Sequence, residues 1–282
     1  MKYREYIKRW MPPIIIDTYR NIKYKKNEQN HKKLWSGNYE TWDQAKAQST
    51  GYDAQIILEK VKNSMLLVKA GKAVYERDSV LFDKIQYSWP TLAALLKVAG
   101  EYDGNLNVLD FGGSLGSTYF QNRDFFAHIK SLNWCIVEQK NFVEEGKKYL
   151  ADNQLKFYYN IEESISAHKP HLLLLSGVLQ CIDLPYDWIS GFMQHSIPYI
   201  VVDRTAFISA DNERLTVQNV PEHIYKASYP AWFFNENKFI QSFTAQYSLV
   251  ADFESAFTPP YTLEDGANVY WKGFIFKLIN HA

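Results

Sequence analysis

The sequence predicts an α/β fold, with a doubly wound, mostly parallel sheet of the seven-stranded type and a helical extension at the N-terminus. Short apolar runs alternate with helical segments from residue 106 to residue 202, as in a parallel sheet that has helices on both faces. A glycine-rich turn directly follows the first apolar run. Two late apolar segments, near 246–253 and 271–279, are suited to an antiparallel pair that completes the sheet.

The alternating region contains apolar runs that we expect to be strands, at 106–110, 132–138, 155–159, 172–176 and 198–202. The helices expected between these strands cover 117–131, 141–151 and 185–195. Two further helices are expected before the first strand, in segments where apolar residues recur at helical spacing and a glycine follows, at 53–69 and 92–99.

The chain of 282 residues has room for one α/β domain with an added segment, or for two small domains. We divide it into a basic amphipathic segment at 1–33, a helical cap at 34–104 and the α/β domain at 105–282. Within that domain the aromatic segment 204–240 is expected to be a long substrate loop, because long insertions near a ligand-binding face tend to be functional.

Charge and cysteine content limit the possible partners. The formal net charge is zero, which gives no electrostatic case for nucleic acid. Residues 1–33 carry ten Lys and Arg against three acidic residues, so residues 1–30 either contact an anionic membrane surface or pack on the domain as a solvated helix. Two cysteines provide neither a disulfide framework nor a metal site. Without a signal peptide or an apolar run long enough to span a membrane, a cytoplasmic location is expected.

The glycine-rich turn is the first candidate ligand site. A glycine loop before a helix start is the usual place to hold a nucleotide-like ligand, but this turn departs from the dinucleotide pattern G-x-G-x-x-G. A carboxylate two residues before the first glycine repels a pyrophosphate and attracts a ligand with an ammonium and a sulfonium group, such as S-adenosylmethionine. A structural aspartate in an ordinary strand-to-helix turn is the alternative. The cofactor-binding residues expected in this turn are Asp110, Gly112, Gly113, Ser114 and Gly116.

Glu138 is the second candidate, at the end of the second strand. A carboxylate there can accept hydrogen bonds from both hydroxyls of a ribose; a solvated acid after a strand is the alternative. A nicotinamide-dependent enzyme would share Glu138 but not Asp110. No Tyr-x-x-x-Lys pattern stands near the fourth or fifth strand.

The loop resembles the glycine-rich first motif of class I methyltransferases. The chain after its basic N-terminus further resembles a family of bacterial S-adenosylmethionine-dependent methyltransferases, Rossmann-like in fold, whose members are often encoded among genes for surface polysaccharides. The matching segments are Trp35–Tyr39, Gly51–Asp53, Tyr75–Ser79, Leu109–Gly113 and Tyr229–Phe233. The resemblance implies S-adenosylmethionine as the cofactor and a role in polysaccharide synthesis, and only the cofactor loop carries over residue by residue.

Other segments extend the expected cofactor site. The segment that begins at Ser176 resembles the methyltransferase stretch that lines the methionine end of the cofactor, where Gln180 either contacts the cofactor or faces a neighbouring strand. N-terminal helices often close over the cofactor in this class, and Tyr75 and Arg77 are candidates for such a lid. A surface cluster of salt bridges is the alternative for these two residues.

The acceptor site is expected after the fifth strand. Asp203 and His223 are the groups available to take a proton, and Arg204 could bind an anionic group or pair with an acid. Tyr229 and Trp232 could stack on a sugar ring. The hypothesis is an S-adenosylmethionine-dependent methyltransferase that acts on a hydroxyl or amine of a sugar or glycan precursor. The alternatives are a nicotinamide-dependent nucleotide-sugar enzyme and a non-catalytic Rossmann-like scaffold.

Overall fold

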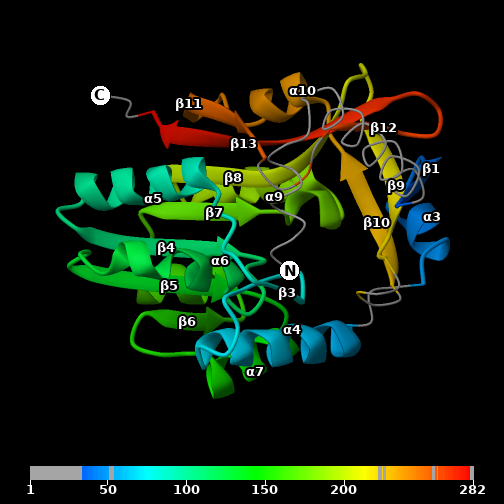
Figure 1. Ribbon diagram of the computed structural model, residues 1–282. Coiled ribbons are helices and arrows are strands. Elements are labelled where there is room, and N and C mark those ends of the chain that lie inside the picture. The colour runs from blue at the N-terminus through cyan, green and yellow to red at the C-terminus, as the bar shows by residue number, and fades with distance from the viewer. Residues whose placement is uncertain are drawn as a thin grey trace, which may run out of the picture.

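A computed structural model describes residues 34–50, 54–221, 224, 227–255, 258 and 260–279. Its strands form a central sheet, a small three-stranded sheet and a two-stranded hairpin (Figure 1). The basic segment 1–33, with its expected membrane contact, lies outside the described residues. No helix in the part of the chain that the structure describes is long and apolar enough to cross a membrane.

The central sheet confirms the predicted α/β class. Its order across the sheet is β6 (Leu155–Tyr158), β5 (Ser131–Val137), β4 (Asn105–Phe111), β7 (Leu172–Ser176), β8 (Tyr199–Ile208), β13 (Asn268–Leu278) and β11 (Tyr247–Glu254). The first five are parallel neighbours, whereas β13 runs antiparallel to β8 and β11. A short strand, β12 (Tyr261–Thr262), also pairs with β13. The two late apolar segments form the antiparallel pair that was predicted, and the last described strand, β13, is inserted between β8 and β11.

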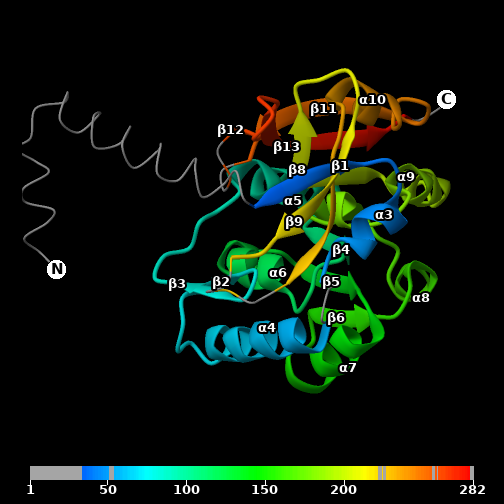
Figure 2. The ribbon, with the colours of Figure 1, turned by 90° about the vertical axis from the view of Figure 1, so that its right-hand side faces the viewer.

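Helices cover both faces of this sheet. The first face carries α4 (Ala54–Lys69), α5 (Trp89–Glu101), α6 (Ser117–Asn122) and α7 (Lys140–Tyr149). The second face carries α8 (Ile161–Ala167), α9 (Pro185–Gln194) and α10 (Glu236–Gln241). Figures 1 and 2 show α4 and α7 side by side near the β6 edge.

Alternation along each strand supplies both cores. Val108 and Leu174 pack with the helices of the first face, while their neighbours Leu109 and Leu173 pack with those of the second. Successive side chains of a strand point to opposite faces, and burial of both faces explains why these strands read as continuous apolar runs.

The helix expected at 117–131 is shorter than predicted. It ends at Asn122 and continues only as a 3-10 turn, η1 (Arg123–Phe126). The Nδ2 atom of Asn122 donates a 2.9 Å hydrogen bond to the carbonyl oxygen of Thr118. Asparagine side chains compete in this way with the backbone, so this residue favours the end of a helix.

The segment 34–104, expected to be helical, also contains strands. Strands β2 (Tyr75–Arg77) and β3 (Val80–Phe82) form a hairpin that contacts α4 and α6. Its two turn residues, Asp78 and Ser79, have φ angles of +52° and +68°. Positive φ at both central residues is the mark of a type I′ turn, whose twist suits a two-residue hairpin.

The segment 204–240, expected to be a loop, is largely regular structure. It holds the end of β8, then β9 (Arg214–Asn219), β10 (Ser228–Phe233) and α10. Strand β1 (Trp35–Tyr39) pairs with β9 to complete the small sheet, beside the short helix α3 (Trp42–Ala47). This sheet stands beyond the carboxyl ends of the parallel strands (Figure 1). Pro230 makes the sequence of β10 look like a loop. A proline is tolerated there because β10 is an edge strand.

Candidate functional site

The glycine loop joins β4 to α6 at the carboxyl ends of the parallel strands. The backbone N–H of Gly112 donates a 3.0 Å hydrogen bond to the carbonyl oxygen of Val137, which ties the loop to β5. Gly116 is the N-cap of α6 and has a φ of +95°, a conformation that glycine adopts without steric cost. Ser114 also has a positive φ, +53°.

Asp110 lies directly beneath this loop. Its side chain is 1% exposed, and its Oδ2 accepts a 2.9 Å hydrogen bond from Nε1 of Trp134. A Cβ atom at Gly113 would lie 2.5 Å from the carboxyl group of Asp110. The loop therefore rests on the carboxyl group at a distance that only glycine allows. Burial raises the pKa of Asp110 to about 7, against the effect of the Trp134 hydrogen bond.

Glu138 follows β5 and lies beside the same loop. Its Oε2 accepts a 2.7 Å hydrogen bond from the backbone N–H of Gln139. Burial raises the pKa of Glu138, while hydrogen bonds from the backbone of Gln139 and Ser114 oppose this rise. The structure thus brings Glu138 and the glycine loop together. That they form two parts of one ligand site stays a prediction.

Glu76 is a buried carboxyl group that the sequence analysis did not single out. It is 1% exposed, and it accepts hydrogen bonds from the hydroxyl of Ser117, at the start of α6, and from the backbone N–H of Ser79. Burial raises its pKa to about 7. The one feature of the sequence that pointed to Glu76 was its place between the lid candidates Tyr75 and Arg77. Its hydrogen-bond partner Ser117 lies 41 positions away, so this contact could not be predicted from sequence.

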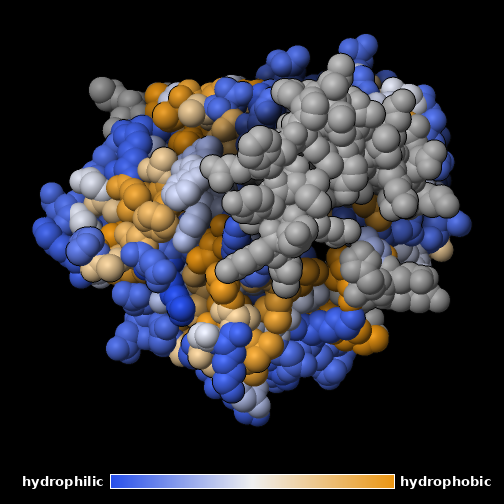
Figure 3. All heavy atoms as spheres, viewed as in Figure 1, coloured by the Kyte–Doolittle hydropathy of each residue, from blue (hydrophilic) through white to orange (hydrophobic). Residues whose placement is uncertain are grey.

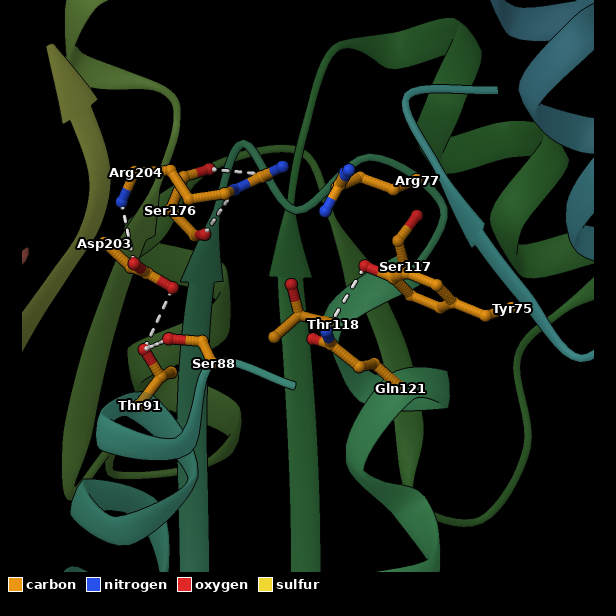
Figure 4. A pocket seen from close by; sticks show the side chains of 10 residues that line it. All are labelled: Tyr75, Arg77, Ser88, Thr91, Ser117, Thr118, Gln121, Ser176, Asp203 and Arg204. Carbon is orange, nitrogen blue, oxygen red and sulfur yellow. Dashed lines mark hydrogen bonds between the residues drawn. The ribbon is translucent and has the colours of Figure 1, made fainter. Parts of the chain in front are cut away.

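A small cavity of about 20 Å³ opens between the hairpin, the N-termini of α5 and α6, the end of β7 and the middle of β8 (Figure 4). Five of its lining residues were candidates from the sequence: Tyr75, Arg77, Ser176, Asp203 and Arg204. The others were not predicted: Ser88, Thr91, Ser117, Thr118 and Gln121. Most of the unpredicted residues lie at the starts of α5 and α6 and reach the cavity only through the tertiary fold.

Asp203 forms the floor of one side of the cavity. Its Oδ2 accepts a 3.0 Å hydrogen bond from the hydroxyl of Thr91, and its Oδ1 accepts one of 2.8 Å from the backbone N–H of Arg204. The hydroxyls of Thr91 and Ser88 lie 2.9 Å apart, so Ser88, Thr91 and Asp203 form a buried chain (Figure 4). Burial raises the pKa of Asp203, against the positive charge of Arg204 and these hydrogen bonds.

Arg204 connects the cavity floor to the hairpin. It has a φ of +52°, and its Nε donates a 3.2 Å hydrogen bond to the hydroxyl of Ser176. Its Nη1 lies 3.6 Å from Oδ2 of Asp78 in the hairpin turn. Gln180 donates a 3.1 Å hydrogen bond to the carbonyl oxygen of Arg204, and its own Oε1 is buried without a hydrogen-bond partner in the described part of the chain.

The remaining acceptor candidates do not line this cavity. Tyr229 and Trp232 lie on β10 in the small sheet, and the ring of Trp232 stacks on that of Trp42 at 6.4 Å. His223 lies outside the described residues. Of the two candidate bases, the structure therefore places only Asp203 at the cavity.

No protein-family model and no curated protein sequence matches the chain. Solved structures that resemble it include the N-terminal domain of EvdMO1, crystallised in the presence of SAH and D-fucose (TM-score 0.44, 11% identity, 81% of this chain and 98% of that chain). CalS10, a SAM-bound amino pentose methyltransferase from Micromonospora echinaspora, has a TM-score of 0.40 and 11% identity over 68% of this chain and 92% of that chain. The glycopeptide N-methyltransferase MtfA, complexed with sinefungin, has a TM-score of 0.41 and 7% identity over 67% of this chain and 87% of that chain.

Proposed function

We propose that the protein is an S-adenosylmethionine-dependent methyltransferase. The observation that carries the proposal is the contact between the glycine loop and the buried carboxyl group of Asp110. A carboxylate at this position disfavours the pyrophosphate of a dinucleotide and favours a ligand that carries positive charge. Glu76 and Asp203 add two further buried carboxyl groups to the same end of the sheet.

The order of the strands supports the same proposal against the nicotinamide alternative. The dinucleotide-binding fold has six parallel strands in the order 3-2-1-4-5-6. Here the first five positions agree, but the last strand of the chain, β13, is inserted antiparallel between β8 and β11. An antiparallel pair at the end of the sheet is typical of class I methyltransferases and supports that assignment.

The residues around the loop suit the cofactor. Any larger residue in place of Gly112 or Gly113 would fill the space beside the loop. A Cβ atom at Gly112 would lie 2.5 Å from Val178, and one at Gly113 would lie 2.5 Å from Asp110. Glu138 stands at the strand end where a ribose is bound in related folds. The buried Oε1 of Gln180 has no hydrogen-bond partner among the described residues and is available to a ligand donor. S-adenosylmethionine supplies, when bound, a methyl group on a positively charged sulfur.

The chain's own contribution to the reaction is the removal of a proton by Asp203. The Asp203 carboxylate would take the proton of the acceptor hydroxyl as the acceptor oxygen is methylated, and S-adenosylmethionine would supply the methyl group and leave as S-adenosylhomocysteine. Burial raises the pKa of Asp203, which makes its carboxylate a better base. Thr91 and the backbone of Arg204 hold this carboxylate in place. His223 stays a second candidate for this role.

The acceptor is proposed to be a hydroxyl or amine of a sugar or glycan precursor, within surface-polysaccharide synthesis. The resemblance to the methyltransferase family supports this choice. The cavity lining supports it too, because hydroxyl and amide groups can pair with the hydroxyls of a sugar: Ser88, Thr91, Gln121 and Ser176. Arg204 could hold an anionic group of the precursor.

Binding requires the hairpin to move. A cavity of about 20 Å³ holds little more than one water molecule and is far too small for the proposed cofactor. Several contacts hold the hairpin in its closed position, among them those of Glu76 with Ser117 and of Asp78 with Arg204. We propose that these contacts open to admit the cofactor and that Tyr75 and Arg77 close over it.

Calorimetry with S-adenosylhomocysteine tests the proposed cofactor. The wild-type protein should bind it, and Gly113→Ala should abolish binding because a Cβ atom would collide with Asp110. Gly100→Ala is the matched control, since a Cβ at this helical position meets no atom within 4 Å. Binding of NADH in place of S-adenosylhomocysteine would overturn the proposal. Binding of S-adenosylhomocysteine without methyl transfer to any glycan fraction would instead support the non-catalytic scaffold.

A further inference from the structure

Three aromatic rings form a cluster on the surface where α5 begins. Tyr87 lies 4.8 Å from Trp89 and 5.2 Å from Phe125, and Trp89 lies 5.8 Å from Phe125, each distance measured between ring centroids. Trp89 is 59% exposed and Phe125 38%. We call Tyr87, Trp89 and Phe125 the aromatic platform. The rings pack against one another in tilted and edge-on arrangements, which fixes their orientation. A large area of aromatic ring is therefore exposed to solvent in a defined geometry.

The platform adjoins the cavity through a single short loop. Ser88 lies between Tyr87 and Trp89 in the chain, and its side chain lines the cavity. On the other side of Tyr87, Gln86 accepts a 3.0 Å hydrogen bond from Nη1 of Arg77, which is also a lining residue. The side chain of Gln121, a third lining residue, donates to the backbone carbonyl oxygen of Gln86. These two hydrogen bonds and the position of Ser88 in the chain thus fix the platform beside the cavity wall.

The chemistry of the platform differs from that of exposed aliphatic side chains such as those of Leu81 and Leu96. On the face shown in Figure 3, apolar side chains gather over α5 and around β3 and α4. The aliphatic side chains of Leu81 in β3 and Leu96 in α5 are 41% and 38% exposed. The platform instead consists only of aromatic rings, and Asp124 and Arg123 precede Phe125 directly in the chain. Asp124 lies close enough to Tyr87 to raise the pKa of its hydroxyl, after the larger effect of burial.

Aromatic faces next to carboxylate and amide side chains suit a sugar ring. The face of an aromatic ring carries partial negative charge and attracts the weakly positive C–H groups on one side of a pyranose. Carboxylates and amides at the rim can pair with the hydroxyls around that ring. An aliphatic lipid chain or an apolar protein partner would gain nothing from Asp124 or Gln86. Trp232, the aromatic residue expected to stack on the acceptor, is already stacked on Trp42.

We propose that the aromatic platform is a binding subsite for a sugar ring of the acceptor, next to the ring that is methylated in the cavity. This inference rests on the proposed function, because it assumes that the acceptor enters the cavity. The platform then favours acceptors with at least two sugar units over a single free sugar. The first unit reaches Asp203, and the second lies on Trp89.

An array of bacterial oligosaccharides and their nucleotide-sugar precursors tests this proposal, with the full chain as the probe. The wild-type protein should bind at least one oligosaccharide, and Trp89→Ala should weaken that binding about three- to tenfold, as expected for the loss of one stacked ring. Trp89→Phe should keep part of the affinity, since a ring remains. Tyr149→Ala is the matched control: Tyr149 is 38% exposed like Phe125 but lies at the end of α7.

Each other outcome overturns the proposal. It is wrong if the wild-type protein binds no sugar on the array, or if Trp89→Ala binds as the wild type does. It is also wrong if the platform binds anionic or neutral vesicles in place of sugars and Trp89→Ala abolishes that binding. Titration of every variant with S-adenosylhomocysteine separates this result from the proposed function. Trp89→Ala should bind S-adenosylhomocysteine as the wild type does. If the wild type does not bind S-adenosylhomocysteine, that result counts against the proposed methyltransferase function and not against the sugar subsite.

Discussion

The indole nitrogen of Trp134 donates a 2.9 Å hydrogen bond to the Oδ2 atom of Asp110, directly below the glycine loop. Trp134 is itself fully buried in the core of the first sheet face. The hydrophobic core and the proposed cofactor site therefore share one residue. A substitution in the core should therefore affect ligand binding at the loop, and a substitution in the loop should affect the stability of the core.

Trp134→Phe should lower the free energy of unfolding by about 1–3 kcal/mol at pH 8 beyond the loss of ring volume, because it leaves a buried carboxylate without its donor. Urea unfolding measures this cost. In the Asp110→Asn background the same change should cost less, since no charged group remains to be satisfied. Equal costs in the two backgrounds would show that the hydrogen bond contributes nothing.

The stability of the protein should fall as the pH rises from about 4 to 7. Burial raises the pKa of Asp110 and of Glu76 to about 7 in the folded protein, whereas unfolded carboxyl groups titrate near pH 4. In this window the folded state holds more protons than the unfolded state, so a higher pH favours unfolding. Urea unfolding at several pH values should show this slope, and Asp110→Asn should flatten it. A slope of opposite sign would contradict the raised pKa values.

Ser79→Gly should stabilise the protein by about 1 kcal/mol. Residue 79 has a φ of +68°, a conformation that is strained for a residue with a Cβ atom but unstrained for glycine. Thermal unfolding provides the measurement. Ser248→Gly, within the exposed strand β11, should instead destabilise the protein, since glycine weakens a strand. If both changes act in the same direction, the turn conformation is not the cause.

Asp78→Asn should speed the association of S-adenosylhomocysteine up to about fivefold, because it removes the ion pair that holds the hairpin against Arg204. An exposed pair of this kind contributes about 1 kcal/mol or less. Stopped-flow fluorescence gives the rate. The control is Asp265→Asn, which removes the 2.6 Å ion pair with Arg214 at the small sheet and should leave the rate unchanged. A hairpin that does not gate binding predicts equal rates in all three proteins.

Thr91→Val should reduce kcat about tenfold and leave the KM for S-adenosylmethionine unchanged. The change removes the hydroxyl that orients the Asp203 carboxylate, a loss comparable to one hydrogen bond to a charged group. Thr91→Ser keeps the hydroxyl and should retain most of the rate. A comparable loss in both variants would assign Thr91 to packing alone.

The sheet was predictable from sequence because its strands are buried on both faces and read as apolar runs. Asp110, the glycines and Glu138 could be proposed as site residues because strand ends and turns have recognisable local sequence patterns. Thr91 and Asp203 could not be paired from sequence, since they are 112 positions apart and only packing of α5 against β8 brings them together. Strand β10 was misread as a loop because Pro230 and its aromatic neighbours resemble a loop when the pairing partner is unknown.

The small sheet imposes an order on the assembly of the molecule during synthesis. Strand β1 pairs with β9, and Thr50 exchanges hydrogen bonds with Ser228 across 178 positions. The first described strand therefore has no sheet to join until residues 214–219 have left the ribosome. By then all the parallel strands have been made, so they can collapse first. The small sheet can form beyond the carboxyl ends of these strands once β10 has been made. Strands β11 and β13, which are made later, complete the central sheet.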